Sequence, residues 1–391
     1  MDNNIIQNII DSFSSPVFVF DENELIDRTN AILEILGDIS LCFSIKANPF
    51  LIPSLLPIVR YFEVCSPGEL AICQQLNVPG DKIIYSGVHK ELSDITEAVR
   101  YDVAYLTAES LRQYDLICQA AGEENRIVKV ILRLTSKNQF GMSEKDMEII
   151  LGSLCSNVLV EGIHYFAGTG RKSLKKHQEE LAMLSDLLNR LRNKSGLKLP
   201  MLEYGPGLPF PYFTDEDYSD TLKPLKDLIH DLINISGHCT LSVEMGRFLA
   251  SSCGCYITKI CDIKTSNDTK WCIIDGGINH INYLGQMMGM RIPVIRHYKK
   301  GILIDDISGE MCTICGSLCT VNDILVRSMP VSDPEIGDIL IFTNIGAYSV
   351  TEAPGLFLSR TLPRIIMRRD NETQMIRDFR ESWKINIKDD L

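Results

Sequence analysis

The stretch Phe43-Ser44-Ile45-Lys46-Ala47-Asn48-Pro49 ends a short apolar run with a single lysine and closes it with a proline. This pattern predicts a buried strand followed directly by a turn, so that Lys46 projects from the end of the strand. A lysine in a partly dry pocket loses its charge more readily than one in water, and a neutral amine attacks carbonyl groups. Lys46 is therefore a candidate Schiff-base lysine. The alternative is an exposed lysine before an Asn-Pro turn.

Seven further short apolar or alternating runs follow the run that ends near Lys46, and helix-length segments separate them. The runs are Leu41–Ile45, Phe62–Cys65, Lys82–Ser86, Val103–Thr107, Val128–Leu134, Val160–Phe166, Met201–Tyr204 and Leu241–Glu244. The helical segments are Pro67–Gln75, Leu92–Arg100, Ala108–Ala121, Ser143–Leu151, Leu174–Leu191 and Thr221–Ile235. Eight strands that alternate with helices over roughly 200 residues fit a (β/α)8 barrel better than a doubly wound sheet.

Barrels of this kind carry their functional residues at the C-terminal ends of the strands. Nearly every run here ends in a chemically active group. These groups are Lys46, Cys65-Ser66, Ser86-Gly87, Arg133, His164–Thr169, Gly205-Pro206-Gly207 and Glu244–Arg247. We therefore expect them to gather at one end of the predicted barrel.

The pattern changes after about residue 250, where strand-forming runs separated by turn-forming residues begin. Tyr256–Lys264, Trp271–Ile274 and Ile336–Phe342 read as strands. The α/β barrel is therefore predicted over residues 25–245 and a mostly β C-terminal domain over 246–391, together with residues 1–24. We expect the charged tail from Arg368 to be a solvated end.

Composition excludes several classes of partner. The 391 residues carry a net charge of −12, which argues against nucleic acid or an anionic membrane as the main partner. No basic segment followed by an apolar core opens the chain, and the apolar run Phe50–Val59 contains two prolines and is too short to span a bilayer. We expect a cytoplasmic protein whose thirteen cysteines are mostly reduced and buried.

The cysteines at 312, 315 and 319, with those at 253 and 255 upstream, suggest a zinc site because thiolates at such short spacing can share one ion. Their spacing is not that of a zinc ribbon, and no histidine lies close by in the sequence. We therefore predict no bound metal.

The segment Glu244-Met245-Gly246-Arg247 combines three groups that suit one cofactor. A carboxylate at a strand end can keep a pyridine nitrogen protonated, while the amide of Gly246 and the guanidinium of Arg247 can reach a phosphate. The Gly205-Pro206-Gly207 loop also lets the backbone approach a ligand closely. With Lys46, these segments point to pyridoxal phosphate. The alternatives are a salt bridge at the barrel end and a plain turn.

Two segments of the second domain carry further reactive groups. Gly316-Ser317-Leu318-Cys319-Thr320 places a thiol and hydroxyls in one tight segment, and Gly346-Ala347-Tyr348 supplies a phenol that can donate to a phosphate. A buried structural thiol and a core tyrosine are the alternatives.

In this order, Lys46-Ala47-Asn48, Gly168-Thr169, Gly205-Pro206-Gly207, Glu244–Arg247, Cys319 and Gly346-Ala347-Tyr348 resemble the motifs of the fold-type III pyridoxal phosphate decarboxylases. That family has an alanine racemase-like barrel and includes the ornithine, arginine and diaminopimelate decarboxylases. The resemblance covers essentially the whole chain.

The resemblance implies a role for each matching residue. Lys46 would bind the cofactor covalently, Glu244 would protonate its ring nitrogen, and Arg133 would support Glu244 or the ring hydroxyl region. Cys319 would come from the second subunit of a head-to-tail homodimer and return a proton to the substrate. The residues expected around the phosphate and its loops are Gly168, Thr169, Gly205, Gly207, Gly246, Arg247 and Tyr348.

The chain departs from the family pattern at the cofactor ring. The position that usually holds a stacking histidine is Phe166 here, and His164 lies two residues earlier. Phe166 can still stack on the cofactor ring, whereas a proton donor over the ring face is lost unless the His164 side chain extends to it. Pro206 also removes one backbone N–H from the glycine loop.

Other departures concern the substrate. Thr320 stands where decarboxylases that bind a distal ammonium have an acid, and Tyr283 and Met287 stand where diaminopimelate decarboxylases have an arginine and a tyrosine. Arg291 or Arg296 could supply the missing positive charge, but each lies at a different position in the sequence from the arginine of those enzymes. A free charged side-chain end would then be desolvated without a partner, which disfavours diaminopimelate, ornithine and lysine. We expect Tyr283, Arg291 and Thr320 to line the substrate site.

These features are closer to decarboxylases of natural-product and siderophore pathways, some of which act on amino acids conjugated through the side chain to a carrier protein. The sequence thus predicts a pyridoxal phosphate-dependent decarboxylase of an amino acid or such a conjugate. The alternatives are an amino-acid racemase, a diaminopimelate decarboxylase with an altered distal pocket, and a non-catalytic cofactor-binding relative.

Overall fold

The computed structural model describes residues 3–304 and 308–388, which form two compact units. The barrel unit comprises Arg28–Pro209 and Asp220–Leu249. The β unit comprises Met1–Asp27, Phe210–Ser219 and Ala250–Leu391. The short segment Phe210–Ser219 thus groups with the β unit although barrel sequence lies on both sides of it, and each unit is described separately below.

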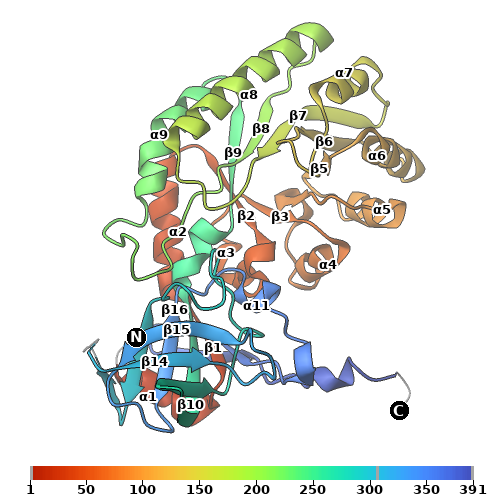
Figure 1. Ribbon diagram of the computed structural model, residues 1–391. Coiled ribbons are helices and arrows are strands. Elements are labelled where there is room, and N and C mark those ends of the chain that lie inside the picture. Colours follow the sequence, from red (N-terminus) through yellow and green to blue (C-terminus); the bar gives the residue numbers. More distant parts are fainter. Residues whose placement is uncertain (1–2, 305–307, 389–391) are drawn as a thin grey trace. The chain divides into compact units, whose positions relative to one another are not determined.

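The barrel unit closes eight parallel strands into a ring, which confirms the predicted (β/α)8 barrel (Figure 1). The strands are β2 (Ser40–Ser44), β3 (Tyr61–Val64), β4 (Ile83–Tyr85), β5 (Tyr105–Ala108), β6 (Val128–Arg133), β7 (Val158–Phe166), β8 (Met201–Gly205) and β9 (Thr240–Met245). Every strand pairs with the next in sequence, and β9 pairs with β2. All eight predicted strand segments are therefore present.

Helices connect the barrel strands, and serine residues begin several of them. The helices of this region are α2 (Glu22–Leu36), α3 (Ile52–Leu55), α4 (Pro67–Gln75), α5 (Leu92–Arg100), α6 (Leu111–Glu123), α7 (Glu144–Gly152), α8 (Leu174–Ser195), α9 (Lys223–Ser236) and α10 (Arg247–Ala250). Ser66 caps α4 by accepting from Glu69 N at 3.1 Å. Among the helices of residues 3–304 and 308–388, none is long and apolar enough to cross a bilayer.

The barrel interior changes from apolar to charged along the strands. Cys42, Tyr61, Ile84, Ile131 and Met201 form one buried apolar layer. Side chains alternate between the two faces of a strand, so the residue two positions further along points to the same interior. On three strands that next interior residue is charged, and these residues are Glu63, Arg133 and Glu203. The barrel therefore places buried charges toward the C-terminal ends of its strands.

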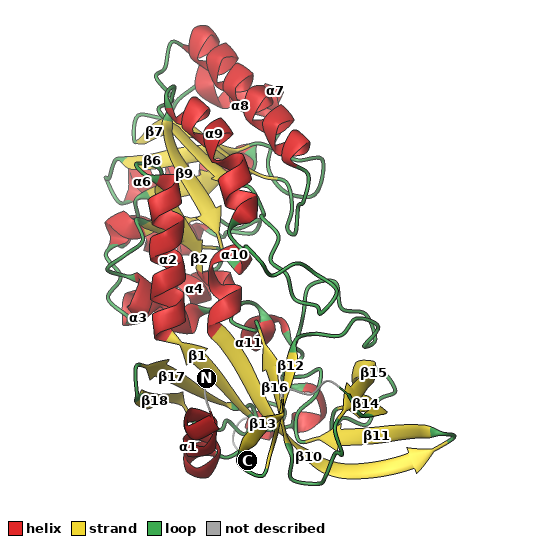
Figure 2. Cartoon of the chain, turned by 90° about the vertical axis from the view of Figure 1, so that its left-hand side faces the viewer, coloured by secondary structure: helices red, strands yellow, loops and turns green. Residues whose placement is uncertain are grey.

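The β unit is built on one branched sheet, which confirms the mostly β second domain. Its strands are β1 (Val17–Asp21), β10 (Gly254–Ser266), β11 (Thr269–Ile274), β12 (Ile295–Lys299), β13 (Ile302–Ile304), β14 (Glu310–Cys315), β15 (Ile324–Val331), β16 (Ile339–Thr343), β17 (Arg364–Arg369) and β18 (Glu372–Arg377). The main order is β13-β12-β16-β10-β1-β17-β18, while β11, β14 and β15 extend from β10. The long paired strands β10 and β11 are clear in Figure 2.

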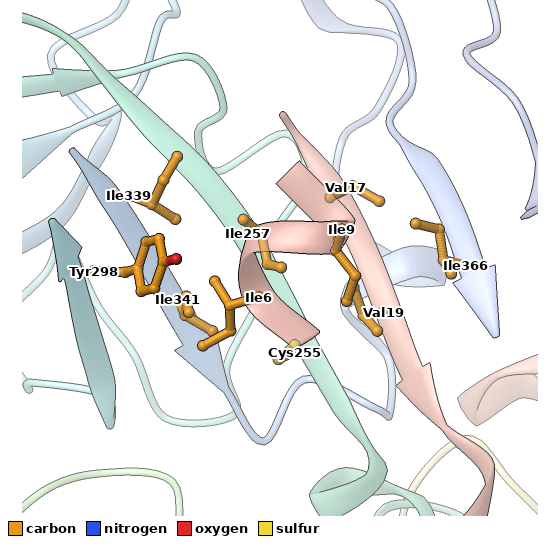
Figure 3. Close-up of a cluster of buried hydrophobic side chains, with 10 residues drawn as sticks. All are labelled: Ile6, Ile9, Val17, Val19, Cys255, Ile257, Tyr298, Ile339, Ile341 and Ile366. Atoms are coloured by element: carbon orange, nitrogen blue, oxygen red, sulfur yellow. The ribbon is translucent and has the colours of Figure 1, made fainter. Parts of the chain in front are cut away.

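The core of the β unit joins both ends of the chain. Its buried residues are Ile6, Ile9, Val17, Val19, Cys255, Ile257, Tyr298, Ile339, Ile341 and Ile366 (Figure 3). Ile6 and Ile9 come from α1 (Asn3–Phe13), a helix that the sequence analysis did not predict. The three-residue spacing of these isoleucines is typical of one face of an amphipathic helix and could have predicted it.

The tail from Arg368 is largely exposed, as expected, but the sequence did not predict that residues 364–369 and 372–377 pair as β17 and β18. The side chains of β18 are almost entirely exposed. This strand is therefore held by backbone pairing and shows none of the apolar alternation that predicts a half-buried strand.

Candidate active site

Lys46 lies immediately beyond β2, in the 3-10 turn Ile45–Ala47. Its Nζ donates to Oε2 of Glu63 at 2.7 Å and lies 3.5 Å from Oε1 of Glu244 and 3.6 Å from Sγ of Cys65. The lysine side chain is 37% exposed, whereas both carboxylates are buried. The sequence suggested a dry pocket for the amine; the structure instead gives its ammonium form two buried counter-charges.

Glu244 is the centre of the buried polar group. Its Oε1 accepts from the Ser44 hydroxyl at 2.7 Å, and its Oε2 lies 3.3 Å from Nε2 of His164. Burial alone would raise the pKa of Glu244, but Lys46, His164 and Ser44 together hold that pKa well below its usual range. Glu244 is therefore an ionised carboxylate at the C-terminal end of β9.

Two glycine loops approach each other backbone to backbone beside this carboxylate. A Cβ on Gly205 would lie 2.5 Å from the Phe166 ring and 3.3 Å from Oε2 of Glu244. Gly207 has a φ of +59°, and a Cβ there would lie 1.8 Å from the carbonyl oxygen of Gly168. Only glycine fits at position 207, whereas a side chain at position 205 would require the Phe166 ring to move. The bare backbone of these glycines is the kind of surface that binds phosphate.

The remaining predicted cofactor residues of the barrel unit lie next to these loops in sequence or after β9. Thr169 follows Gly168, and its Cα is 3.2 Å from the position of a Cβ on Gly207. Arg247 begins α10 directly after Gly246 and is 8% exposed. A buried guanidinium and a threonine hydroxyl are suitable donors to an anionic group.

Arg133 contacts a residue that the sequence reading missed. Its Nη1 donates to Oε1 of Glu109 at 2.9 Å, and its guanidinium lies over the Phe140 ring. Glu109 also accepts from Gly141 N at 3.1 Å. The structure thus pairs Arg133 with Glu109 rather than with Glu244.

Glu63, Glu203 and Ser44 were also missed. They lie inside the predicted strands and were read as parts of apolar runs. A glutamate in the middle of an apolar run could have indicated a polar site inside the barrel, because a buried carboxylate requires a partner or a proton.

In the β unit, Cys319 and Thr320 lie in a loop that is held in place by hydrogen bonds to Asp323. Asp323 accepts from the backbone N–H of Leu318 at 2.7 Å and from that of Ile278 at 2.8 Å. The thiol of Cys319 is exposed and Thr320 is half-buried. The loop therefore presents a thiol on a rigid support.

Tyr348 follows a tightly packed glycine. It has a φ of +67° and is the residue immediately before α11 (Ser349–Glu352). A Cβ on Gly346 would lie 2.0 Å from the carbonyl oxygen of Ala250, so that position accepts only glycine. Tyr348 is half-buried.

The two other predicted substrate residues are both engaged within the β unit. Tyr283 is buried, and its hydroxyl donates to the carbonyl oxygen of Thr343 at 2.7 Å. Arg291 pairs with Asp215 at 2.6 Å and lies 3.4 Å from Glu216. Neither side chain offers an uncommitted charge to a substrate.

The β unit contains a cavity of about 450 Å³ that is lined in part by Asn322, three residues after Cys319 in the sequence. Its walls include Met287 and Met288, which are 68% and 44% exposed, together with the neutral polar residues Gln286 and Asn322. Within the described part of the chain, Glu352 is the one charged residue that lines it, and Glu352 accepts from Nδ2 of Asn282 at 3.1 Å. The cavity is therefore largely apolar and almost uncharged.

The barrel, the lysine beyond its first strand, the ionised carboxylate and the glycine loops define a pyridoxal phosphate-dependent enzyme. The family model "Pyridoxal-dependent decarboxylase, pyridoxal binding domain" matches residues 22–251. The chain belongs to this family and is a pyridoxal phosphate-dependent amino-acid decarboxylase. The predicted family, fold, cofactor and enzyme class are confirmed.

The curated relatives extend over nearly the whole chain. The L-glutamyl-[BtrI acyl-carrier protein] decarboxylase of Niallia circulans is 26% identical over 93% of this chain and 91% of its own length. The diaminopimelate decarboxylase of Aquifex aeolicus is 24% identical over 88% of this chain and 84% of its own length.

Solved structures show the same fold. The diaminopimelate decarboxylase from M. jannaschii superposes with a TM-score of 0.86 and 23% identity, covering 98% of this chain and 94% of that chain. The lysine/ornithine decarboxylase from Vibrio vulnificus, complexed with putrescine, gives a TM-score of 0.82 and 18% identity over 94% of this chain and 98% of that chain.

Proposed function

We propose that this decarboxylase acts on an amino acid whose side-chain end is uncharged because it is joined to another group, such as the arm of a carrier protein. The observation that carries the proposal is the almost uncharged cavity of the β unit. A free distal carboxylate needs a cationic partner there, whereas Arg291 is already paired with Asp215. The relative from Niallia circulans, whose name specifies a carrier-linked glutamyl substrate, supports this substrate class.

The buried groups of the barrel unit suit the cofactor. When bound, pyridoxal phosphate supplies an electron-accepting ring that stabilises the carbanion left by the departing carbon dioxide. In this proposal Lys46 holds the cofactor covalently, and Glu244 holds a proton at the ring nitrogen. Phe166 and His164 orient the ring, while the bare backbone of Gly168 and Gly207 surrounds the phosphate.

The proposal assigns supporting roles to further residues. The residues expected to assist at the phosphate are Thr169, Gly205, Gly246, Arg247 and Tyr348, and Arg133 supports the site through its pair with Glu109. Each supplies a donor or a bare backbone to an anion.

The proposal assigns the final proton to Cys319, supplied by a second copy of this chain. The thiol is exposed on a loop that Asp323 holds in place, as a proton donor to a substrate on another subunit must be. Mixing Lys46→Ala with Cys319→Ala tests this arrangement. If the site is shared, the mixture recovers up to about a quarter of the wild-type activity, because about half of the dimers are mixed and each of these has one intact site of two. No recovery after subunit exchange would contradict it.

Glu352 favours a second candidate substrate class. Its carboxylate at the edge of the cavity could pair with a free distal ammonium, as in lysine or ornithine. Glu352→Gln separates the two classes. It should abolish activity toward a diamino acid and leave activity toward a neutral conjugate within about two-fold.

The substrate test is release of carbon dioxide by the enzyme loaded with pyridoxal phosphate. Matched pairs would be compared: L-glutamate with its side-chain pantetheine thioester, and L-lysine with Nε-acetyl-lysine. Faster release from the capped member of a pair supports the proposal, and faster release from the free members overturns it. Deuterium uptake at Cα without carbon dioxide release would identify a racemase instead.

A further inference from the structure

Three polar side chains lie in one row across the barrel interior. The Cα positions of His164, Glu203 and Ser242 are in register on the neighbouring strands β7, β8 and β9. Glu203 and Ser242 are fully buried, and His164 is 1% exposed. The row therefore runs beneath Glu244, two residues beyond Ser242 on the same strand.

This row holds polar atoms that lack a nitrogen or oxygen partner, although the Cys42 thiol lies within hydrogen-bond reach of Glu203. Both carboxyl oxygens of Glu203, Nδ1 of His164 and Oγ of Ser242 have no nitrogen or oxygen partner among residues 3–304 and 308–388. A buried donor or acceptor without a partner destabilises the folded state, and an ionised one does so more strongly. Four such atoms on neighbouring strands indicate that these side chains hydrogen-bond to one another after small side-chain rotations or through an ordered water.

The surroundings of Glu203 are dominated by negative charge. Facing it are the Cys42 thiol from β2, Glu63 from β3, His164 from β7 and Glu244 from β9, with Lys46 beyond them. Burial, followed by the charges of Glu244 and Glu63, raises the pKa of Glu203 well above its usual range. Lys46 already has Glu63 and Glu244 within 3.5 Å.

We propose that Glu203 is a permanently protonated carboxylic acid that acts as a positioning residue for the cofactor site. Its O–H donates to Nδ1 of His164, after a side-chain rotation or through one water. The Nε2–H of His164 then donates to Oε2 of Glu244, which lies 3.3 Å away. Because Glu203 is neutral, Glu244 keeps the negative charge that faces the ring nitrogen. The last step rests on the role proposed above for Glu244.

The proton on Glu203 can be tested without cofactor or turnover. Infrared difference spectra of the cofactor-free protein should show a carbonyl band of a protonated carboxyl group at neutral pH that is missing in Glu203→Gln. Glu179→Gln, on the exposed face of α8, is the control and should leave this band in place. A wild-type spectrum without such a band, or a band that titrates near neutral pH, would overturn the proposal.

Thermal unfolding provides a second test. The unfolded state releases this proton above its ordinary pKa while the folded state keeps it, so the wild type loses stability as pH rises from that value. Glu203→Gln carries no such proton. The melting temperature of Glu203→Gln minus that of the wild type should therefore increase steadily with pH between about 5 and 8. A flat difference would show that Glu203 is ionised in the folded state.

Nitrogen-15 spectra of His164, assigned with His164→Asn, test the hydrogen bond. Glu203→Gln retains an N–H donor, so Nδ1 of His164 should stay unprotonated. The pH profile of kcat should be unchanged, and kcat should remain within about three-fold of the wild-type value. Glu203→Leu removes the donor and should alter the tautomer, shift the profile and lower kcat about ten-fold or more. An unchanged tautomer and profile in Glu203→Leu would contradict the role; if that variant does not fold, the infrared and unfolding results on Glu203→Gln decide.

Discussion

The barrel unit and the β unit present two different kinds of surface. In the barrel unit, Lys46, Glu63, Glu244 and His164 form a network of polar and charged side chains in which successive members lie within 3.5 Å and all but Lys46 are buried. The cavity of the β unit has exposed methionines and only Glu352 as a charged lining residue among those described. One surface is fixed and charged, and the other is open and almost neutral.

This contrast separates chemistry from substrate choice. Charges on the ends of packed strands hold a cofactor in one geometry, because burial strengthens each electrostatic contact and leaves little room to move. Methionine side chains on loops adapt to ligands of different shape. We expect substitutions in the first region to change kcat strongly and those in the second region to change KM more gently.

The largest effect should follow Lys46→Ala. Loss of the amine removes covalent attachment of the cofactor, so activity should fall at least about 10³-fold and the visible absorbance of the bound cofactor should change. Lys175→Ala, on the exposed side of α8, is the control and should retain both. Normal activity of Lys46→Ala would show that another lysine binds the cofactor.

Cys319→Ala should reduce kcat by about 10²–10⁴-fold, the usual contribution of a proton donor. Cys261→Ala tests an equally exposed thiol elsewhere in the β unit and should behave as wild type. Steady-state kinetics on one substrate would distinguish them. Equal activities would remove Cys319 from the reaction.

Glu244→Gln should reduce kcat about 10²-fold, since a neutral amide cannot hold a proton at the ring nitrogen as a carboxylate does. It should also change acid stability. The low pKa of Glu244 means that its charge stabilises the folded state above the unfolded pKa and that this contribution is lost as pH falls through the folded pKa. The difference in melting temperature between wild type and Glu244→Gln should therefore narrow only at acidic pH, which calorimetry of the cofactor-free protein can follow.

The smallest effect is expected at the neutral cavity. Met287→Glu places a second negative charge on its wall and should raise KM for a capped substrate about ten-fold while kcat changes little. Met311→Glu, exposed on β14 and outside the cavity lining, should leave KM unchanged. A larger loss in kcat than in KM would place Met287 in the chemical step.

The sequence predicted the barrel well because each parallel strand is buried on both faces and reads as a short apolar run. Lys46 and Glu244 were predictable from their places after such runs. The pairing of Arg133 with Glu109 was not, since it joins strands whose register no local pattern reveals. Glu203 was missed for a related reason: its environment consists of side chains from four other strands.

The roles assigned to the individual residues of the two surfaces remain predictions. The most direct test of the contrast is the ratio of kcat/KM for the side-chain pantetheine thioester of L-glutamate to that for free L-glutamate, measured as carbon dioxide release. The account predicts a ratio of about 10² or more, because a free carboxylate would enter the neutral cavity without a partner. A ratio of one or below would contradict it.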